Sequence, residues 1–182
     1  MKSVLISIQP KWCERIANGK KTIEVRKTRP NLETPFKCYI YQIASNEKYK
    51  LLSGKVIGEF VCDKVDEQIV FHKGITRIMI RGYKEKLSAL CEAAALSLDE
   101  LHEYIDKDGK DLEIIYGWHI SDLKIYNEPK YICDFKRLKP KSCFAQEYTS
   151  NGEQPCMCCI CCSLSFAPQS WRYVEEQNEY ED

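Results

Sequence analysis

The spacing of apolar residues predicts one helix and four strands in the first third of the chain. Val4–Ile8 is an almost continuous apolar run, typical of a buried strand. Apolar residues then recur at helical spacing from Trp12 to Ala17. Asn18-Gly19 follows as a helix stop, because glycine accepts the left-handed cap conformation. Further strands are predicted over residues 22–27, 38–43 and 54–65.

The middle of the chain is predicted to be helical, and strand character returns after it. One helix is expected over Tyr83–Leu96. Ser97 and Glu100 have the spacing of a capping box, so a second helix should start there and run to about Ile105. A strand is expected over residues 112–126, and Pro129 and Pro140 should interrupt regular structure beyond it. This order lacks regular strand–helix alternation and favours an α+β fold, a small, mostly antiparallel β-barrel with flanking helices.

Composition narrows the class of protein. The 182 residues are 44% hydrophobic, which suits one compact domain with an appendage. The net charge is zero, which excludes a globally basic nucleic-acid coat. The first thirty residues nevertheless carry eight bases against two acids, and the tail from Tyr173 is acidic. That tail is interpreted as a frayed terminus or as an acidic arm over a basic cleft.

The chain is expected to be cytoplasmic and without a membrane partner. It contains no apolar stretch of about 18 residues, and its first residues do not form a signal peptide. A reducing compartment would keep most of its 11 cysteines as free thiols.

The most informative motif follows the first predicted helix. Lys21 falls where the turn becomes a strand, and Glu24 and Arg26 then share one strand face while Ile23 and Val25 take the other. An amine, a carboxylate and a guanidinium can thus emerge together at the surface. If chemistry occurs there, we expect hydrolysis, with Lys21 as nucleophile or base, Glu24 orienting it and Arg26 holding the substrate. The alternative is an ordinary exposed ion pair between Glu24 and Arg26.

The spacing Gly19-x-Lys21-x-x-Glu24-x-Arg26 resembles the signature of the ASCH domain, a relative of the PUA domain. The resemblance covers roughly residues 1–138 and extends to Gly58-Glu59 and to the strand with Trp118. It implies a small β-barrel whose signature residues line a cleft, and a protein that binds RNA or a nucleoside or nucleotide. In a groove continuous with the signature, the ligand-binding set would be Gly19, Lys20, Arg26, Lys27 and Arg29.

Two enzymatic branches of that family are alternatives. One resembles acetylcytidine amidohydrolases, which have a lysine where this chain has Lys21 but a threonine where it has Glu24. Their later carboxylate would correspond to Glu92 or Glu100. The other branch resembles metal-dependent ribonucleases. If this chain is a hydrolase, its candidate catalytic residues are Lys21 and Glu24.

Trp118 and His119 are adjacent on one predicted strand and must face opposite ways. Trp118 is interpreted as a core residue or as a platform on which a base stacks. His119 is interpreted as a structural histidine or as a ligand contact.

The segment 139–182 is predicted to be a cysteine-rich extension with an acidic end. Its block from Cys156 to Cys162 contains overlapping C-x-x-C pairs, a spacing that suits zinc. The candidate ligands are Cys143, Cys156, Cys159 and Cys162. The alternatives are an unliganded loop, acylation or a vicinal disulfide. A third function class follows from this segment, a protein-interaction module in which the cysteine tail is the active part.

Overall fold

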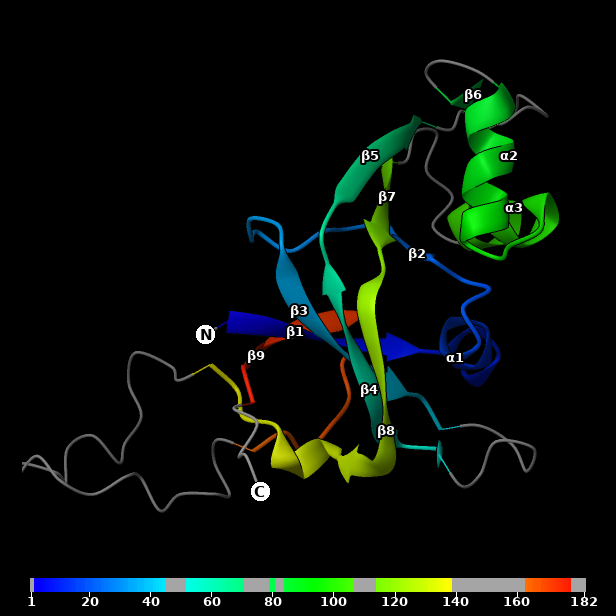
Figure 1. Ribbon diagram of the computed structural model, residues 1–182. Helices are drawn as coiled ribbons and strands as arrows, with labels where there is room; N and C mark the ends of the chain where they lie inside the picture. Colours follow the sequence, from blue (N-terminus) through cyan, green and yellow to red (C-terminus); the bar gives the residue numbers. More distant parts are fainter. Residues whose placement is uncertain are drawn as a thin grey trace, which may run out of the picture. The chain divides into compact units, whose positions relative to one another are not determined.

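The computed structural model describes residues 2–44, 52–70, 79–80, 84–106, 114–138 and 163–177. Their strands form a five-stranded sheet in the order β8-β4-β3-β1-β9 and a four-stranded sheet in the order β2-β7-β5-β6 (Figure 1). The chain divides into two compact units. The first contains residues 1–10, 37–58 and 126–182, and the second contains residues 11–36 and 59–125. Strands β4 (Lys55–Cys62) and β8 (Ser121–Tyr131) contribute residues to both.

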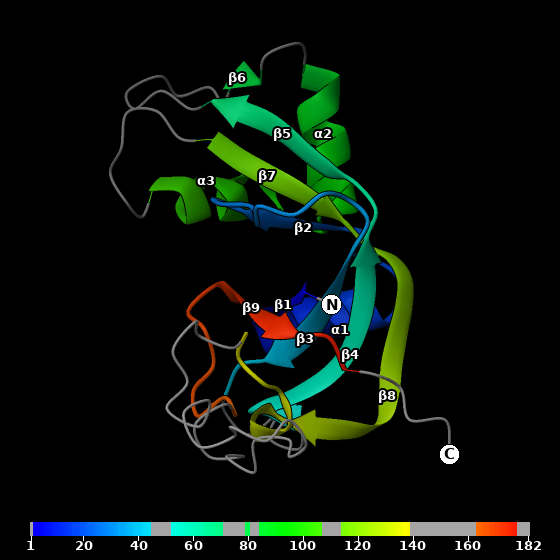
Figure 2. The same cartoon turned by 90° about the vertical axis from the view of Figure 1, so that its left-hand side faces the viewer.

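The first unit is built around strand β1 (Lys2–Ile8). This strand pairs in parallel with β3 (Phe36–Gln42) and antiparallel with β9 (Trp171–Glu175), as Figure 2 shows. Strand β1 has a partner at each edge, and the side chains of Val4–Ile8 are buried on both faces of the strand, at 0–5% exposure. A short 3₁₀ helix, η2 (Ile132–Asp134), follows β8.

The core of the first unit joins residues that are far apart in the sequence. Its buried members are Leu5, Tyr39, Val56, Phe135, Leu164 and Val174. The rings of Tyr39 and Phe135 meet edge to face, with centroids 4.9 Å apart. Packing on this core therefore holds residues from both ends of the chain.

The second unit carries the signature motif. Strand β2 (Ile23–Arg26) pairs antiparallel with β7 (Ile114–His119), which pairs with β5 (Val65–Val70), and β5 pairs with β6 (Met79–Ile80). Three helices belong to this unit: α1 (Pro10–Ala17, except its first residue), α2 (Lys84–Ala93) and α3 (Leu98–Asp106). Within the described residues β2 is thus an edge strand.

Helices α2 and α3 share a core with the sheet of the second unit. Its buried members are Val25, Cys91, Ala94, Leu101, Ile105 and Ile115. The capping box predicted at the start of α3 is confirmed. The Ser97 hydroxyl accepts a bond from the Glu100 N–H at 3.1 Å, and Glu100 Oε2 accepts one from the Ser97 N–H at 2.9 Å.

Several expectations need correction. Neither sheet closes on itself in the described part of the chain, so the barrel is not confirmed, while the α+β class is. Pro129 lies inside β8 instead of ending it. This strand is at the edge of its sheet, where a residue without an N–H is tolerated.

The expected frayed tail begins with a strand, because Trp171–Glu175 pairs with β1. Among the described helices, none has the length and apolarity to cross a membrane.

Candidate functional site

The site begins at the tight turn after α1. Gly19 has φ +73°, a left-handed conformation that suits a residue without a side chain. Its N–H donates to the carbonyl of Ile16 at 2.9 Å, and the N–H of Lys20 donates to Asn18 Oδ1 at 3.2 Å. The N–H of Lys21 then returns to the carbonyl of Arg15 at 2.9 Å. These bonds confirm the predicted helix stop and fix the position from which Lys21 enters β2.

The pairing of β2 with β7 decides where the signature side chains point. Glu24 lies opposite Trp118, and Arg26 lies opposite Tyr116, so these residues share one face of the sheet. The sequence predicted that Glu24 and Arg26 would emerge at the surface. Instead all four residues of β2 are buried. The alternation of side chains along the strand correctly predicted that Glu24 and Arg26 share one face of β2. It did not predict that the residues on both faces of this strand are buried.

Lys21, Glu24 and Arg26 form one continuous chain of ion pairs. Lys21 Nζ is 3.2 Å from Glu24 Oε2, and Arg26 Nη2 is 2.9 Å from Glu24 Oε1. Each carboxylate oxygen therefore meets a different cation. Their side chains are 2%, 7% and 11% exposed, respectively. The three groups predicted to come together do so, in a largely water-free environment where charge–charge interactions are strong.

The end of α2 also holds Lys21 in place. Lys21 Nζ donates to the carbonyl of Ala94 at 2.8 Å, and the N–H of Thr22 donates to the carbonyl of Ala93 at 2.8 Å. The guanidinium of Arg15 donates to the carbonyl of Ala95. Cations at a helix C-terminus satisfy its unpaired carbonyls and favour its dipole. Part of the basic charge near the N-terminus thus stabilises a helix end.

The charges of Glu24 and Arg26 affect the pKa values of two weakly acidic groups nearby. Burial raises the pKa of the Cys13 thiol far above its ordinary value, Glu24 raises it further, and Arg26 opposes both. Burial also raises the pKa of Tyr104, against the effect of Arg26. Both groups are therefore neutral at physiological pH, and Cys13 is not a nucleophile.

The aromatic residue beside Lys21 is Trp12, which the sequence reasoning did not select. The ring centroid of Trp12 is 5.3 Å from Lys21 Nζ, 4.5 Å from Lys11 Nζ and 4.8 Å from Arg15 Cζ. A signal was present for one of these contacts, because Trp12 lies three residues before Arg15, a spacing that places two side chains on the same side of a helix.

Trp118 is fully buried and packs edge to face on Phe36, with ring centroids 5.8 Å apart. This burial favours the interpretation of Trp118 as a core residue, because a stacking platform needs an accessible face.

His119 points to the opposite face and is held by an acidic partner. Its Nε2 is 2.7 Å from Asp66 Oδ2, and Lys64 Nζ is 2.7 Å from Asp66 Oδ1. Burial raises the pKa of Asp66, but hydrogen bonds from Lys64 and His119 bring it below its ordinary value. In the structure His119 thus belongs to a separate polar cluster on β5 and β7.

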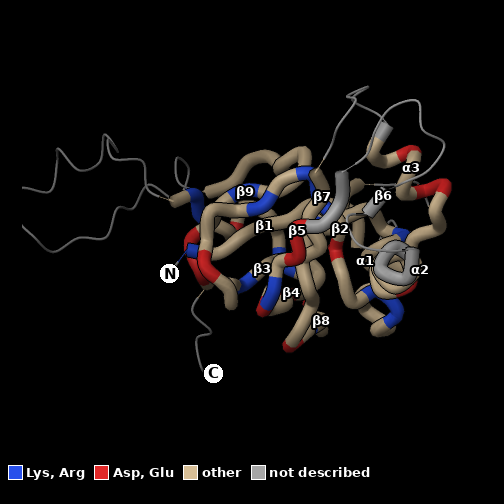
Figure 3. Tube along the Cα trace, turned by 90° about the horizontal axis from the view of Figure 1, so that it is seen from above, with Lys and Arg blue, Asp and Glu red and all other residues tan. Residues whose placement is uncertain are grey.

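The other predicted ligand contacts differ in their exposure. Lys20 and Arg29 are exposed, while Lys27 is half-buried and donates to the carbonyl of Ile105 at 3.2 Å. Figure 3 shows basic positions along α1.

Glu100, a candidate for the later carboxylate, is instead engaged by Lys11 and Ser97. The hydrogen bond from Lys11 is the main reason why the pKa of Glu100 lies below its usual value. Glu92, the second candidate, is exposed.

All four predicted zinc ligands, Cys143, Cys156, Cys159 and Cys162, lie outside the described residues. Across the described ranges, no group of three or more His, Cys, Asp or Glu side chains is arranged to hold a metal. Zinc binding by the cysteine block stays a prediction from the sequence.

The arrangement suits recognition by hydrogen bonding. Lys21 is paired with a carboxylate and donates to a carbonyl, and the guanidinium of Arg26 is a planar fork of the kind that fits phosphate or a carbonyl edge. The groups are fixed before any ligand arrives, which lowers the entropic cost of binding.

Comparison with known proteins gives a family and a fold. The sequence matches the ASCH domain over residues 6–154. A search of curated proteins found no match. The fold is similar to the crystal structure of ASCH from Zymomonas mobilis, with 16% identity and a TM-score of 0.56, covering 96% of this chain and 88% of that one.

Two variants of the Zymomonas protein give the same result. A tyrosine-to-phenylalanine variant has 18% identity and a TM-score of 0.56, covering 97% of this chain and 92% of that one. A serine-to-alanine variant has 18% identity and the same TM-score, covering 96% and 89%. With the match over most of its sequence, this chain belongs to the ASCH domain family.

Proposed function

We propose that this protein binds RNA and holds one nucleotide unit at Lys21, Glu24 and Arg26. The ASCH family is generally linked to RNA binding. The observation that carries the proposal is the preassembled chain of an amine, a carboxylate and a guanidinium, with distances of 3.2 and 2.9 Å. Nucleobases and phosphates offer the acceptors and donors that such a set recognises.

The burial of these side chains favours a single nucleotide over a long open groove. At 2–11% exposure, the three side chains present a small polar face. Contacts to the flanking phosphates would come from the exposed cations Lys20 and Arg29. The proposal thus assigns recognition of the base to the three buried residues and attraction of the RNA phosphates to Lys20 and Arg29.

The test is binding of a fluorescein-labelled single-stranded RNA 12-mer, followed by fluorescence polarisation. The double variant Lys21→Met/Glu24→Leu removes one cation and one anion together, so the net charge of the three positions is unchanged, while Arg26 loses its ion pair with Glu24. We expect it to bind at least about 10-fold more weakly, because its charge-assisted hydrogen bonds to the ligand are removed. Circular dichroism and thermal melting establish that the variant is folded.

A second pair of variants separates phosphate recognition from base recognition. Lys20→Gln/Arg29→Gln should weaken binding and lower the slope of log affinity against log salt by about 0.7 for each phosphate that the variant no longer neutralises. The exposed Lys124→Gln is the matched control and should leave both quantities unchanged. Unchanged affinity in the folded Lys21/Glu24 variant, or no binding of RNA by the wild type, overturns the proposal.

Hydrolysis at the same residues is the second candidate, favoured by the direct contact of an amine with a carboxylate. In this arrangement, however, Lys21 forms an ion pair with Glu24 and donates a hydrogen bond to the carbonyl of Ala94. To act as a base or nucleophile it would have to leave both. Acetate release from N4-acetylcytidine by the wild type, abolished in Lys21→Met, would favour hydrolysis over binding alone.

A further inference from the structure

Trp12 lies beside the ion-paired residues, with its ring centroid 5.3 Å from Lys21 Nζ. It is half-buried on α1, and three cations lie within 4.5–5.3 Å of its ring centroid. Trp118, by contrast, has no exposed surface. Of the two tryptophans of the second unit, Trp12 is thus the one that is not fully buried.

Each of the three cations around Trp12 also has a hydrogen-bond or ion-pair partner elsewhere in the second unit. Lys11 is paired with Glu100, Arg15 donates to the carbonyl of Ala95, and Lys21 is held by Glu24 and Ala94. These anchors position the cations around the indole before a ligand binds. An aromatic ring and cations that other residues already hold in place lose little conformational freedom on binding.

The chemistry of this cluster matches one kind of ligand. An indole stacks on any nucleobase, and ammonium and guanidinium groups attract the phosphate attached to it. Lys11 is 47% exposed, and the guanidinium of Arg15 has five donors, of which the carbonyl of Ala95 uses one nitrogen. Lys11 and Arg15 can thus contact a phosphate while Arg15 keeps its hydrogen bond to the carbonyl of Ala95, beyond the end of α2.

We propose that Trp12 stacks on the base of one unpaired RNA nucleotide, with Lys11 and Arg15 meeting its phosphate. The proposal rests on the RNA-binding function proposed above and specifies its substrate, an unstacked base in single-stranded RNA. A base within a duplex has both faces covered by its neighbours and is excluded.

The test labels the tryptophans of the whole chain with 5-fluorotryptophan and follows them by ¹⁹F NMR. The chain has three tryptophans, and the Trp12→Phe variant identifies the Trp12 signal by its disappearance. Titration with the single-stranded RNA 12-mer should shift the Trp12 signal and leave that of the buried Trp118 in place. The same sequence as a duplex should shift neither.

Affinity measured by polarisation gives the second readout. Trp12→Leu should bind single-stranded RNA about 10-fold more weakly, Trp12→Phe should recover most of that affinity, and Trp171→Phe should bind like the wild type. Thermal melting of each variant separates a defect in stacking from a defect in folding.

The outcomes distinguish this proposal from the one on which it rests. If RNA binds and depends on Lys21 and Glu24 while the Trp12 signal stays fixed, stacking on Trp12 is wrong and the proposed function stands. Equal affinity of folded Trp12→Leu and wild type leads to the same conclusion. If the wild type binds no RNA by polarisation, both proposals fail.

Discussion

At the scale of the residue, Glu24 is the central group of the buried chain of charges. Its two oxygens contact Lys21 Nζ and Arg26 Nη2, and all three side chains are almost fully buried. Removing one partner of a buried ion pair leaves a charge that has neither water nor its counter-charge. The stability of the second unit should therefore depend strongly on this carboxylate.

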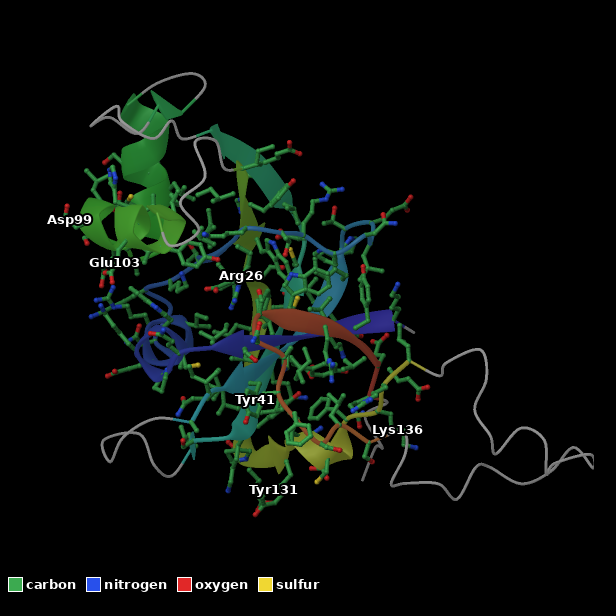
Figure 4. The ribbon with its side chains drawn as sticks, turned by 180° about the vertical axis from the view of Figure 1, so that it is seen from behind. Arg26, Tyr41, Asp99, Glu103, Tyr131 and Lys136 are labelled. Atoms are coloured by element: carbon green, nitrogen blue, oxygen red, sulfur yellow. The ribbon has the colours of Figure 1, made fainter. Side chains whose placement is uncertain are left out.

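Glu24→Gln should lower the free energy of unfolding by about 3 kcal/mol or more, measured by urea denaturation. Glu103→Gln, at an exposed position of α3 that Figure 4 shows pointing outward, is the control and should change it by less than about 0.5 kcal/mol. The triple replacement Lys21→Met/Glu24→Leu/Arg26→Met should be more stable than Glu24→Gln, because it leaves no buried charge. Equal stability of Glu24→Gln and Glu103→Gln would contradict this account.

At the scale of the element, the pairing of β5 with β7 builds the polar cluster of Asp66, Lys64 and His119. Asp66 lies opposite Gly117, and a Cβ at Gly117 would come within 3.1 Å of Ile23 Cγ2. The missing side chain leaves room beside Asp66, whose carboxylate reaches His119 two residues along β7. A side chain at position 117 would therefore require Ile23 to move by a few tenths of an ångström.

This cluster predicts that the stability of the folded protein depends on pH. The pKa of Asp66 in the folded protein lies below the 3.8 of a free side chain, because Lys64 and His119 outweigh burial. Its contribution to stability is therefore complete above the unfolded-state pKa and is lost as the pH falls through the folded-state pKa. Asp66→Asn should cost about 1 kcal/mol or less at pH 7, since Lys64 is well exposed.

Urea denaturation of Asp66→Asn and wild type from pH 7 down to pH 3 measures this effect. The difference between the two proteins should shrink once the pH falls below about 4, when the wild-type carboxylate becomes protonated. Asp63→Asn, at an exposed position nearby, should show no such convergence. A difference that stays constant or grows toward acid would refute the assignment.

At the scale of the whole chain, the C-terminal strand β9 completes the five-stranded sheet. It pairs with β1 from Lys2↔Glu175 to Ile6↔Trp171, and its Val174 is fully buried. The N–H of Gln177 also donates to the hydroxyl of Tyr39 at 2.8 Å. The segment predicted to be an appendage thus supplies part of the first unit's core.

Truncation before Trp171 should lower the free energy of unfolding by at least about 2 kcal/mol, because Val174 and its neighbours would no longer be buried. It should also promote aggregation, because β1 would become an exposed apolar edge. Removing residues 178–182 alone is the control and should preserve both stability and solubility. Thermal melting and size-exclusion chromatography measure the two effects, and equal behaviour of both truncations would exclude a structural role for β9.

Local patterns predicted much of the fold. Helix α1, its glycine stop and the capping box of α3 follow from interactions within a few residues, and the structure confirms all three. Strand β5 and the tail strand β9 were missed, because a strand's pairing partner lies elsewhere in the chain. The barrel was expected from the order of the elements and from the family resemblance, and the sheets are not closed in the described residues.

For the site, the sequence by itself determined the shared face of Glu24 and Arg26 and the entry of Lys21 from the turn, because strand alternation and glycine conformation are local properties. Tertiary structure decided that these groups are buried, that Lys21 is held by the end of α2, and that Trp12, instead of Trp118, lies beside it. Burial and contact depend on which distant elements cover a face. No spacing within one segment encodes that choice.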